Sequence, residues 1–552
     1  MTGQSSLSEH ADLVVVGSGA AGLTGALVAA IEGAKVLVAE KTGLIGGTTA
    51  ISGGGVWIAC NAHMADVGVP DSRDDALEYL RACSEGCGDD AHLVTLVDHG
   101  APMISYLEQK AGIPFRAWNA HGGMIDYRPW LPGARHGGRT LEVEGFSLRQ
   151  LGDWASRIRT EPRLRSVTDL LDYYRQSKHL WSPSALAGMK PPPDDCDTYW
   201  RGTALIARLL QACLRHGVEV WTEARVEQIM MADGRVAGLS LDHQGANKRI
   251  ATSHVLMATG GFANNEELKS LWLNQPLIHT CEIEANQGDG HLMGQAVGAQ
   301  MAGLGDAWWM PHIPLGTENG MANIAGTRED RALPHTLMVN SSGRRFMNEA
   351  TNYNDCGEKF SARTGTGARD FPAWFLFDSQ GAQRYMLLAL KLPAGEKPDW
   401  LHRGETIAEL ASSIGVDFQA LEETVDRFNG FARTGIDRDF HRGENPWDIN
   451  WGDPENKPNP SLGTFAKAPF FALPVYPGAT ATRGGLRVDA RGAVISAANG
   501  EPIEGLHAAG NCSNGSAAGA YVGAGATLGA AMTFSYVAAL EVAARLGKSG
   551  SL

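Results

Sequence analysis

The strongest constraint on the fold is a glycine-rich turn between a short apolar run and a helical stretch. The turn, GSGAAG at 17–22, follows the β-branched run 13–16 and leads into a helical pattern that ends near Ile31. A second apolar run, 35–39, ends in Glu40. Because buried parallel strands are continuous apolar runs, this pattern predicts a strand–helix–strand unit.

Each glycine of this turn has a physical task if the unit binds a dinucleotide. Gly17 makes the tight turn, and Gly19 lets the backbone approach a pyrophosphate. Gly22 allows the helix to pack against the strand, and Glu40 stands where a ribose hydroxyl is bound. The helix N-terminus offers N–H groups and a positive dipole end to the phosphates. The turn therefore predicts nucleotide binding, the alternative being an ordinary glycine-rich turn.

Strand patterns near both ends of the chain fit the same domain. Residues 218–221 and 224–231 indicate a strand and the start of a hairpin, and 254–261 indicates a buried strand that ends in a glycine pair. Residues 505–511 repeat that last form, and the glycine-rich patch 519–529 then leads into a helix. We therefore expect one nucleotide-binding domain made from both ends of the chain.

The expected fold class is α/β, with a Rossmann-like nucleotide-binding domain and an inserted α+β catalytic or cap domain. The predicted boundaries assign 1–308 and 483–552 to the first domain and 309–482 to the inserted one, which is richer in Trp, Pro and charge. The stretch from Ile436 to Gly463 has little periodicity. Such a long loop is typical of a lid or linker, and a merely solvated excursion is the open alternative.

Charge and cysteine content exclude several classes of protein. The 552 residues carry 47 Lys and Arg against 61 Asp and Glu, and a net charge of −14 argues against binding nucleic acid or an anionic membrane. The eight cysteines are scattered, and Cys83 and Cys87, four apart on an expected helix, lack a second pair, so neither a disulfide scaffold nor a metal site is expected. The apolar run 13–31 is broken by glycines and fits neither a signal peptide nor a membrane span. We expect a soluble, cytoplasmic protein without a transmembrane segment.

A second glycine cluster, at 46–55, favours a flavin over a nicotinamide nucleotide, because a flavin needs close backbone over a longer span. With this cluster, the sequence resembles the fumarate reductase/succinate dehydrogenase flavoprotein superfamily. The matching segments are GSGAAG at 17–22, EK at 40–41, GGTTAISGGG at 46–55, ATGGF at 258–262, NQGDGH at 286–291, VNSSGRRFMNE at 339–349 and AAGN at 508–511. The resemblance implies FAD without a covalent link, since members with attached flavin carry a His in the segment corresponding to 48–54, where this chain has none.

The chain has 68 glycines, about 12% against a usual share of about 7%. Much of this excess lies in four segments where backbone is expected to approach FAD: 17–22, 46–55, 258–261 and 510–529. The residues expected to bind FAD are Gly17, Gly19, Ala20, Ala21, Gly22, Glu40, Lys41, Gly46, Gly47, Thr48, Thr49, Ser52, Gly53, Gly54, Val226, Ala258, Thr259, Gly260, Asn286, Asp289, Gly510, Asn511, Ala526, Thr527 and Leu528.

The superfamily includes two main chemistries. Fumarate-type members bind a dicarboxylate through a His in an H-T-x-G-G stretch and an Arg in an A-N-R-x-G-G-N-A stretch. The corresponding stretches here, 481–485 and 520–526, lack that His and that Arg, so a dicarboxylate would lose charge-assisted hydrogen bonds. Because Arg483, Arg344 and Arg345 remain, this interpretation is weakened and stays an alternative.

The second chemistry is the α,β-dehydrogenation of cyclic ketones, as in 3-ketosteroid Δ1-dehydrogenases and cyclohexanone-type dehydrogenases. The C-terminal run resembles their signature, in which a Tyr stands four residues before a Gly, here Tyr521 and Gly525. The family's second Tyr corresponds to Tyr353 and its third to Tyr127. One departure is Val522, where the family usually has Pro; this change affects the loop but keeps the tyrosine hydroxyl and the key Gly.

The resemblance implies a role for each of these residues. Tyr353 is the expected base for the α-proton, helped by the hydroxyl of Tyr127, because a free phenol has a pKa of about 10. The Tyr521 hydroxyl and the Gly525 N–H are expected to bind the carbonyl oxygen like an oxyanion hole. Without the motif context, each Tyr would be a half-buried packing residue.

The expected function is therefore FAD-dependent desaturation of a cyclic ketone to the 2-enone, with the β-hydride passed to flavin N5. Trp118, Tyr199 and Trp308 are candidates for the substrate pocket; steroid and single-ring ketones both remain open. The alternatives are a fumarate reductase-like flavoprotein acting on an unsaturated carboxylate and a non-catalytic electron-transfer subunit. No second nucleotide motif is visible, so the electron acceptor is expected to be quinone-like or oxygen rather than NAD(P).

Overall fold

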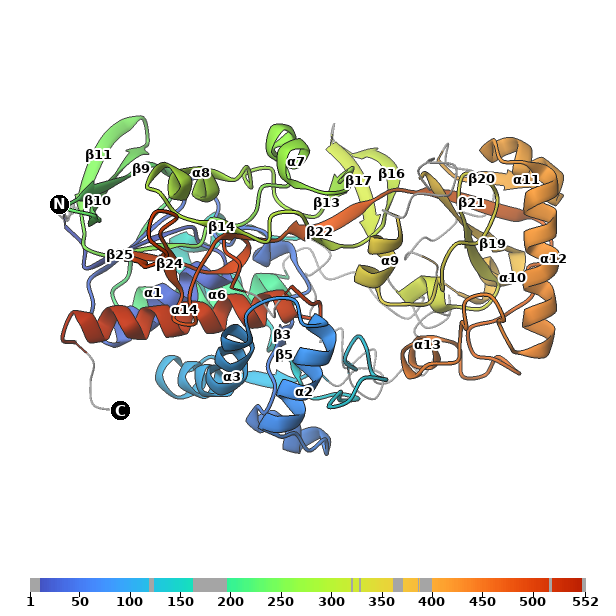
Figure 1. Cartoon of the computed structure of the whole chain (residues 1–552), viewed down its shortest axis with the longest axis horizontal. Coiled ribbons are helices and arrows are strands. Elements are labelled where there is room, and N and C mark those ends of the chain that lie inside the picture. The colour runs from blue at the N-terminus through green and yellow to red at the C-terminus, as the bar shows by residue number, and fades with distance from the viewer. Residues whose placement is uncertain are drawn as a thin grey trace.

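Figure 1 shows a computed structural model in which the chain forms two lobes side by side. The structure describes residues 10–118, 124–161, 196–318, 321–326, 329–360, 371–385, 387, 400–515 and 519–548. The lobe on the left of Figure 1 holds segments from both ends of the chain, and the lobe on the right is built from its middle part.

The larger lobe is organised around a sheet of nine strands with mixed parallel and antiparallel pairing. In spatial order the strands are β11 (Ala246–Ala251), β10 (Arg235–His243), β25 (Pro502–Ala508), β12 (Val255–Met257), β1 (Leu13–Val16), β2 (Val36–Ala39) and β8 (Glu219–Trp221), with β24 (Ala493–Ile495) on β25 and β9 (Ala224–Ala232) on β10. Strand β12 pairs in parallel with both β1 and β25, so one strand separates the first strand of the chain from the last. Both ends of the chain thus contribute to this sheet.

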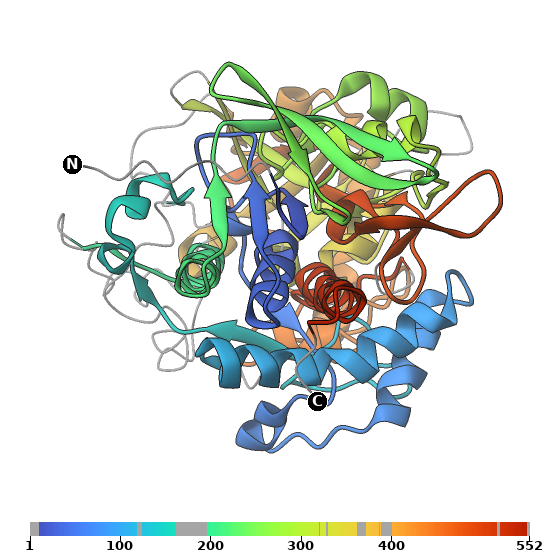
Figure 2. The same cartoon turned by 90° about the vertical axis from the view of Figure 1, so that its left-hand side faces the viewer.

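Helices cover one face of the sheet and explain why its central strands are apolar throughout. Helix α1 (Ala20–Ile31) packs on β1 and β2 and contacts both α6 (Arg201–Arg215) and α14 (Ala526–Arg545). Figure 2 shows α6, α1 and α14 nearly end-on, in a row between the green hairpin strands and α3 (Asp90–Ala111). Because α1 is covered on almost every side, its apolar residues need no polar face.

Among the described residues, α14 is the one helix long and apolar enough to cross a membrane. However, 72% of its most apolar window is buried inside the protein, where it packs on α1 and α3. Its composition is that of a core helix.

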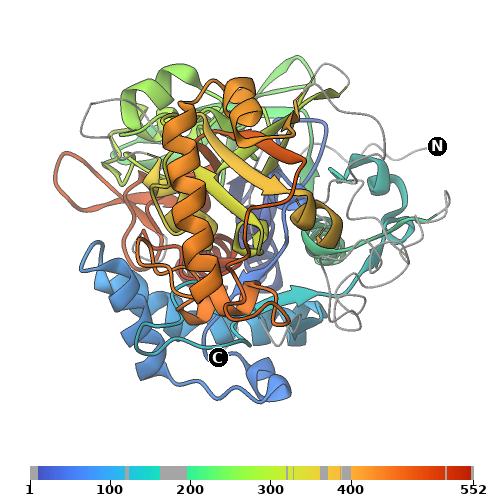
Figure 3. The same ribbon diagram turned by 90° about the vertical axis from the view of Figure 1, so that its right-hand side faces the viewer.

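The smaller lobe contains a four-stranded antiparallel sheet backed by two helices. The sheet has the order β18 (Thr336–Val339), β19 (Ala373–Asp378), β21 (Phe470–Val475) and β20 (His402–Gly404), and α11 (Ile407–Ile414) and α12 (Phe418–Thr434) pack against it. Figure 3 shows α12, in orange, in front of these strands. Strand β22 (Gly478–Thr482) follows and pairs with β15 (Ala307–Trp309) and β13 (His279–Thr280). The domain boundaries expected from the sequence remain a prediction.

The remaining elements are short and complete the two lobes. The strands are β3 (Val56–Trp57), β4 (Phe115–Ala117), β5 (Thr140–Val143), β6 (Phe146–Ser147), β7 (Thr198–Tyr199), β14 (Met301–Ala302), β16 (His312–Glu318), β17 (Met321–Gly326) and β23 (Gly485–Leu486). The helices are α2 (Arg73–Ser84), α7 (Glu266–Trp272), α8 (Asp289–Ala296), α9 (Tyr353–Lys359), α10 (Ser379–Arg384) and α13 (Pro446–Trp451).

One local prediction is wrong, and one open alternative is excluded. Cys83 and Cys87 do not share a helix, because α2 ends at Ser84 and Cys87 is exposed beyond it. The stretch from Ile436 to Gly463 is no solvated excursion, since it contains α13 and six buried polar side chains. These are Asp437, Arg442, Asp448, Asp453, Asn459 and Ser461.

Two buried histidines lie close together in the larger sheet, His507 on β25 and His254 just before the neighbouring β12, and they predict acid sensitivity. His254 and His507 have ring centroids 6.0 Å apart, and burial lowers the pKa of His507 to about 3 and lowers that of His254. The unfolded chain takes up a proton below about pH 6.5, whereas the folded chain does not. Stability is therefore full above that pH and is lost as the pH falls toward 3.

We expect the free energy of unfolding to fall with a slope to which His507 contributes about 1.4 kcal/mol per pH unit. Urea unfolding followed by circular dichroism at pH 7, 6 and 5 measures that slope. In a His507→Gln variant the slope should be smaller by about this amount. Equal slopes in the two proteins would contradict the assignment.

Candidate active site

A long pocket lies where the first strand–helix turn, the N-terminus of α14 and strand β22 meet. It is lined in part by residues 17–21, 47–49 and 51–55, by 258–260, and by 509–511 together with 524–525 and 527–528. These segments come from distant parts of the sequence, and the parallel strands bring their carboxyl ends to one edge of the sheet. In open α/β sheets, ligands bind at this edge.

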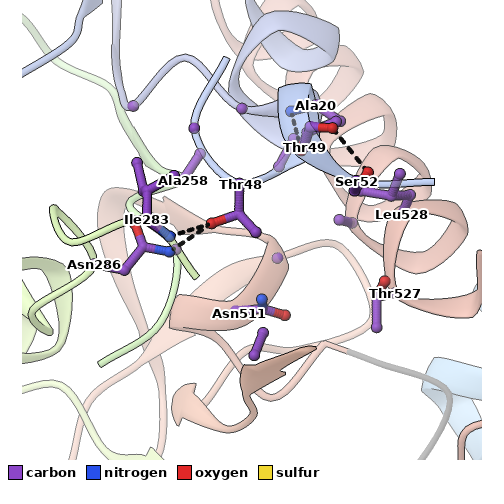
Figure 4. A pocket seen from close by; sticks show the side chains of 18 of the residues that line it. Ala20, Thr48, Thr49, Ser52, Ala258, Ile283, Asn286, Asn511, Thr527 and Leu528 are labelled. Carbon is purple, nitrogen blue, oxygen red and sulfur yellow. Dashed lines mark hydrogen bonds between the residues drawn. The ribbon is translucent and has the colours of Figure 1, made fainter. Parts of the chain in front are cut away.

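The turn into α1 has the geometry that its glycines predict. Gly17 has a φ of +105°, and a β-carbon there would lie 2.4 Å from the carbonyl oxygen of Ala258. Gly19 is the N-cap of α1 and provides no side-chain cap, so the helix N-terminus is open to a ligand on the pocket side. Figure 4 shows Thr49 beside this turn, with Ala20 N–H donating to its Oγ1 at 3.2 Å.

Glu40 lies buried at one end of the pocket. Its Oε2 accepts hydrogen bonds from the backbone N–H and the hydroxyl of Ser18, at 3.2 and 2.6 Å, and its Oε1 accepts from the N–H of Thr42 at 2.9 Å. Nearby, the ammonium of Lys41 pairs with Asp289 at 2.7 Å. These bonds fix an acidic group beside the α1 turn.

On the opposite side, polar groups converge on Thr48. Figure 4 shows Ile283 N–H and Asn286 Nδ2 both directed at Thr48 Oγ1, at 3.3 and 3.2 Å. Thr259 also lines the pocket, and its hydroxyl is buried without a hydrogen-bond partner among the described residues. A buried polar atom of this kind usually has a partner, so the pocket suits a polar ligand.

Three tyrosines meet at another part of the pocket. The Tyr353 hydroxyl donates to the Tyr521 hydroxyl at 2.7 Å. Tyr127 stacks on Tyr521 with centroids 5.3 Å apart and contacts Tyr353 edge-on at 5.2 Å. The outer edges of this cluster are closed by Trp308 against Tyr521 and by Trp447 against Tyr127. The cluster therefore places two hydroxyls side by side within an aromatic wall.

The tyrosine loops are tied together through one backbone carbonyl. The oxygen of Val522 accepts from the Tyr79 hydroxyl at 2.7 Å and from the N–H of Tyr127 at 3.1 Å. A salt bridge of 3.2 Å between Arg128 and Asp355 links the Tyr127 loop to α9, which begins at Tyr353. With Val at position 522 in place of the family's Pro, the carbonyl of this loop is thus held by two hydrogen bonds, from Tyr79 and from Tyr127.

Burial raises the pKa of Tyr353 well above its ordinary value, and the neighbouring Tyr127 and Tyr521 raise it further. The free phenol is therefore neutral at physiological pH. It can give up its proton only when something at the site stabilises the phenolate or when the pH is alkaline.

A buried ionic network holds the segment that leads to Tyr353. Arg345 donates to Glu349 at 2.6 Å and to Asp437 at 2.8 Å, and Arg442 reaches Glu349 at 3.5 Å. All four side chains are buried. Removing one member would leave a buried charge unpaired, so this network fixes the entry to α9.

Gly525 is the N-cap of α14 and reaches the pocket with a φ of +88°. A β-carbon there would lie 2.4 Å from the carbonyl of Gly55, so no other residue fits. Its own carbonyl accepts from Trp57 N–H, whereas its N–H makes no hydrogen bond with any described residue. That N–H is available as a donor within the pocket.

Most of the site residues predicted from sequence line this pocket. They are Gly17, Gly19, Ala20, Ala21, Glu40, Lys41, Gly47, Thr48, Thr49, Ser52, Gly53, Gly54, Trp118, Tyr127, Val226, Ala258, Thr259, Gly260, Asn286, Asp289, Tyr353, Gly510, Asn511, Tyr521, Gly525, Thr527 and Leu528. Their individual roles remain predictions. No cluster of three or more potential metal ligands occurs among the described residues.

Three residues predicted to bind FAD do not line the pocket. A β-carbon on Gly22 would lie 2.0 Å from the carbonyl oxygen of Gly17, in keeping with close helix–strand packing. A β-carbon on Gly46 would lie 2.9 Å from the Ile206 side chain, so Gly46 serves the packing of α6. Ala526 is buried in the apolar cluster around the tyrosines.

Two predicted substrate-pocket residues also lie outside the lining. Tyr199 pairs with Phe146 in a short two-stranded sheet. Trp308 stands behind the pocket, where its indole N–H donates to Asn511 at 3.3 Å and its ring packs on Tyr521. Trp308 therefore supports the wall instead of forming it.

Sequence reasoning missed several lining residues. These include Val16, Ser18, Ala39, Ile51, Gly55, Met124, Ala224, Arg225, Cys281, Ile283, Ala285, Met293, Met310, Thr480, Ala481, Ala509, Ala524 and Ala531. A few were within reach of the motifs, since Ser18 lies inside GSGAAG and Ala285 immediately precedes NQGDGH. Met310 and Thr480 carry no local signal and reach the pocket only through the pairing of β15 with β22.

Comparison with known proteins defines the class. Residues 12–528 match the FAD binding domain family. The chain is 41% identical over 550 residues to a 4-oxocyclohexanecarboxylate 2-dehydrogenase of Sinomonas cyclohexanicum (96% of this chain, 92% of that protein) and 35% identical over 579 residues to a 3-oxosteroid 1-dehydrogenase of Mycolicibacterium smegmatis (100% and 99%). A 3-ketosteroid delta1-dehydrogenase structure from Sterolibacterium denitrificans, in complex with 1,4-androstadiene-3,17-dione, superimposes with a TM-score of 0.88 at 31% identity, covering 98% of this chain and 100% of that one.

The chain therefore belongs to the FAD binding domain family, and it is an FAD-dependent oxidoreductase. The predicted cofactor, FAD, is confirmed, as is the family resemblance.

The pocket has the features that this cofactor requires. The open N-terminus of α1 suits a pyrophosphate, and the buried Glu40 carboxylate suits ribose hydroxyls. A β-carbon on Gly53 would meet nothing within 4 Å, and the Thr259 hydroxyl has no hydrogen-bond partner in the described part of the chain, so space and an unused polar group remain for a ligand.

Gly19→Ala tests the cofactor role apart from the fold. A β-carbon on Gly19 would come no nearer than 3.6 Å to Thr49 Oγ1, and its φ of −69° suits Ala. The apoprotein should therefore keep its stability, while FAD affinity should fall about tenfold or more, the result of about 1.4 kcal/mol of lost contact. Thermal unfolding of the apoprotein and titration with FAD measure the two effects.

The matched control is Gly22→Ala, in which the new β-carbon would collide with the Gly17 carbonyl. This variant should lose stability with or without FAD. Unchanged FAD affinity in Gly19→Ala would contradict the close approach of backbone and cofactor.

Proposed function

We propose that the protein catalyses the FAD-dependent α,β-dehydrogenation of a cyclic ketone to the 2-enone. The observation that carries this proposal is the hydroxyl pair of Tyr353 and Tyr521, 2.7 Å apart in the pocket, with the donor N–H of Gly525 on the same lining. The similar proteins named as dehydrogenases of 3-oxosteroids and 4-oxocyclohexanecarboxylate add support.

In this proposal Tyr521 and Gly525 hold the substrate carbonyl. Loss of the α-proton places negative charge on the carbonyl oxygen, and two donors fixed beforehand stabilise that charge. The hydrogen bonds to the carbonyls of Val522 and Gly525 described above hold the segments of both donors, so neither needs to reorganise during the reaction. The Tyr353 hydroxyl beside Tyr521 is then close to the carbon next to the carbonyl.

Tyr353 is the proposed base for the α-proton, with Tyr127 supporting it as the second phenol of the cluster. When bound, non-covalent FAD supplies the acceptor for the β-hydride at its N5 atom. The surrounding Trp118, Met124 and Met310 side chains line an apolar part of the pocket that suits a ring and excludes water.

A dicarboxylate substrate fits the charges less well. Among the described lining residues the only cations are Lys41 and Arg225, and both approach Asp289, at 2.7 and 3.7 Å. Arg483 pairs with Asp306 and lies over the Trp308 ring. A fumarate-type reaction would need cations near the hydroxyl pair, because two carboxylates must be bound there.

Arg344 and Arg345 are committed elsewhere as well. Arg344 pairs with Glu423 at the surface, and Arg345 belongs to the buried network with Glu349 and Asp437. Neither lines the pocket.

Anaerobic mixing tests the proposal. Cyclohexanone, a 3-ketosteroid and succinate are each added to the FAD-loaded protein while absorbance at the flavin band is recorded. We expect bleaching by at least one ketone and none by succinate. Bleaching by neither ketone would count against the proposal, and rapid reoxidation of reduced protein by fumarate would favour the fumarate-type alternative. A non-catalytic flavoprotein would respond to no substrate.

A further inference from the structure

A thiol–imidazole pair, whose thiol lines the pocket and whose imidazole lies buried beside it, takes no part in the proposed reaction. Cys281 lines the pocket, and its Sγ lies 3.1 Å from Nε2 of His312, which is fully buried. Among the described cysteines, Cys281 is the one on the pocket lining, and it forms no disulfide bond with any of the others.

The pair is held by the backbone of a single segment. Cys281 N–H donates to the carbonyl of Ala479 at 3.0 Å, and His312 exchanges two backbone hydrogen bonds with Tyr476, at 3.0 and 2.9 Å. A β-carbon on Gly478 would lie 1.8 Å from Nδ1 of His312, so the imidazole is packed directly on the backbone there. The short distance between thiol and imidazole is therefore built into the fold.

Strand β22 connects this pair to the tyrosine cluster. Thr480 and Ala481 both line the pocket, and Ala481 belongs to the apolar cluster that includes Tyr521. Thr480 Oγ1 donates to the carbonyl of Trp308, whose ring packs on Tyr521 at 5.2 Å. The thiol thus lies on the wall that continues from the proposed carbonyl site.

We infer that Cys281 is a covalent modification site for α,β-unsaturated ketones, activated by His312; this inference rests on the proposed function for its source of enone. The Sγ–H proton passes to Nε2 of His312 while Sγ bonds to the β-carbon of the enone. The electron pair of the C=C bond moves to give the enolate, whose α-carbon then takes a proton from water. His312 returns its proton to the solvent, so the net change is addition of S–H across C=C, with no change of oxidation state.

Physical chemistry favours Cys281 over the other thiols. The thiolate is the nucleophile, and a nearby imidazole promotes its formation. Burial instead raises the pKa of Cys83 to about 12 and of Cys356 to about 11, which keeps these two thiols protonated. The exposed Cys87 makes no hydrogen bond to a histidine among the described residues, and it serves as the internal reference.

The test treats FAD-loaded protein with 2-cyclohexen-1-one, followed by intact mass and peptide mapping over time. We expect one enone on Cys281, added at least about tenfold faster than on Cys87. The rate of ketone-driven flavin reduction should fall in proportion to the labelled fraction. Cys281→Ser should gain no such adduct, and Cys87→Ser, the matched control, should be labelled at Cys281 as the wild type is.

His312→Gln tests the role of the imidazole. Loss of a general base should slow labelling of Cys281 by about 10²-fold, while labelling of Cys87 stays the same. FAD absorbance and circular dichroism report whether this variant is folded. If it is not folded, the inference is judged from the ratio of Cys281 to Cys87 labelling rates in the wild type. A wild type in which Cys87 is labelled and Cys281 is not would overturn the inference, as would equal Cys281 rates in wild type and folded His312→Gln.

The two proposals fail separately because the enone is supplied directly. Labelling of Cys281 without any ketone-dependent bleaching would reject the proposed reaction but support the thiol as an enone site. Bleaching by a ketone together with an unlabelled Cys281 would do the reverse.

Discussion

Replacing Tyr353 by Phe is expected to slow ketone-driven flavin reduction by about 10²- to 10⁴-fold, the usual contribution of a general base. The change removes only a hydroxyl, and the ring keeps its edge-on contacts with Tyr127 and Tyr521. The fold and FAD binding should therefore persist. Stopped-flow absorbance in a single turnover measures the chemical step directly.

The pH dependence separates loss of a base from a packing effect. Because burial and the neighbouring phenols raise the pKa of Tyr353, its proton is lost only toward alkaline pH, and the wild-type rate should rise with pH. The residual rate of Tyr353→Phe should lack that rise. Tyr106→Phe, which removes a hydroxyl bonded to Glu32 far from the pocket lining, is the matched control and should behave like wild type. A near-wild-type rate in Tyr353→Phe would remove Tyr353 as the base.

Structural features that depend only on residues close together in the sequence could be predicted accurately. The turn of Gly17 and the helix–strand packing of Gly22 depend on a motif of six residues, and the structure shows the expected φ and the expected close contact. Glu40 follows at the end of the next strand and lies at the pocket for the same local reason. A strand–helix–strand unit carries its own geometry, so its sequence is sufficient to place these residues.

The tyrosine cluster could be anticipated only through resemblance. Tyr353 and Tyr521 are 168 residues apart, and no spacing rule brings them together. Even with the resemblance, the sequence did not indicate that Tyr79 fixes the Val522 carbonyl. Such contacts depend on which loops the two lobes place side by side.

The sequence could not show which glycines and small residues serve packing and which meet a ligand, so the roles predicted for positions off the lining stay predictions. Gly46 lies in a glycine cluster expected to approach FAD, yet its missing side chain makes room for Ile206. Ala526 follows the N-cap of α14 but turns into the apolar cluster around the tyrosines. Cys281 and His312 were not paired by sequence, since their contact depends on how each meets the segment from Tyr476 to Ala479.

Tyr521→Phe is expected to lower the rate of flavin reduction by about 10²- to 10³-fold, the effect of removing one donor from an oxyanion hole, about 2.7–4 kcal/mol. The charge on the carbonyl oxygen develops mainly in the transition state. The rate constant at saturating ketone should therefore fall much more than the affinity for the ketone. The concentration dependence of single-turnover bleaching separates these two quantities.

The same variant should differ from Tyr353→Phe in its response to pH. With Tyr353 still present as the proposed base, the small remaining rate of Tyr521→Phe should still rise toward alkaline pH. Gly525 keeps its N–H, so carbonyl binding is weakened and not abolished, and a double variant with Tyr353→Phe should lose the remaining pH dependence. A Tyr521→Phe protein with weaker ketone affinity and an unchanged rate at saturation would show that this hydroxyl binds the ground state alone, and the assignment of Tyr521 to the developing charge would then be wrong.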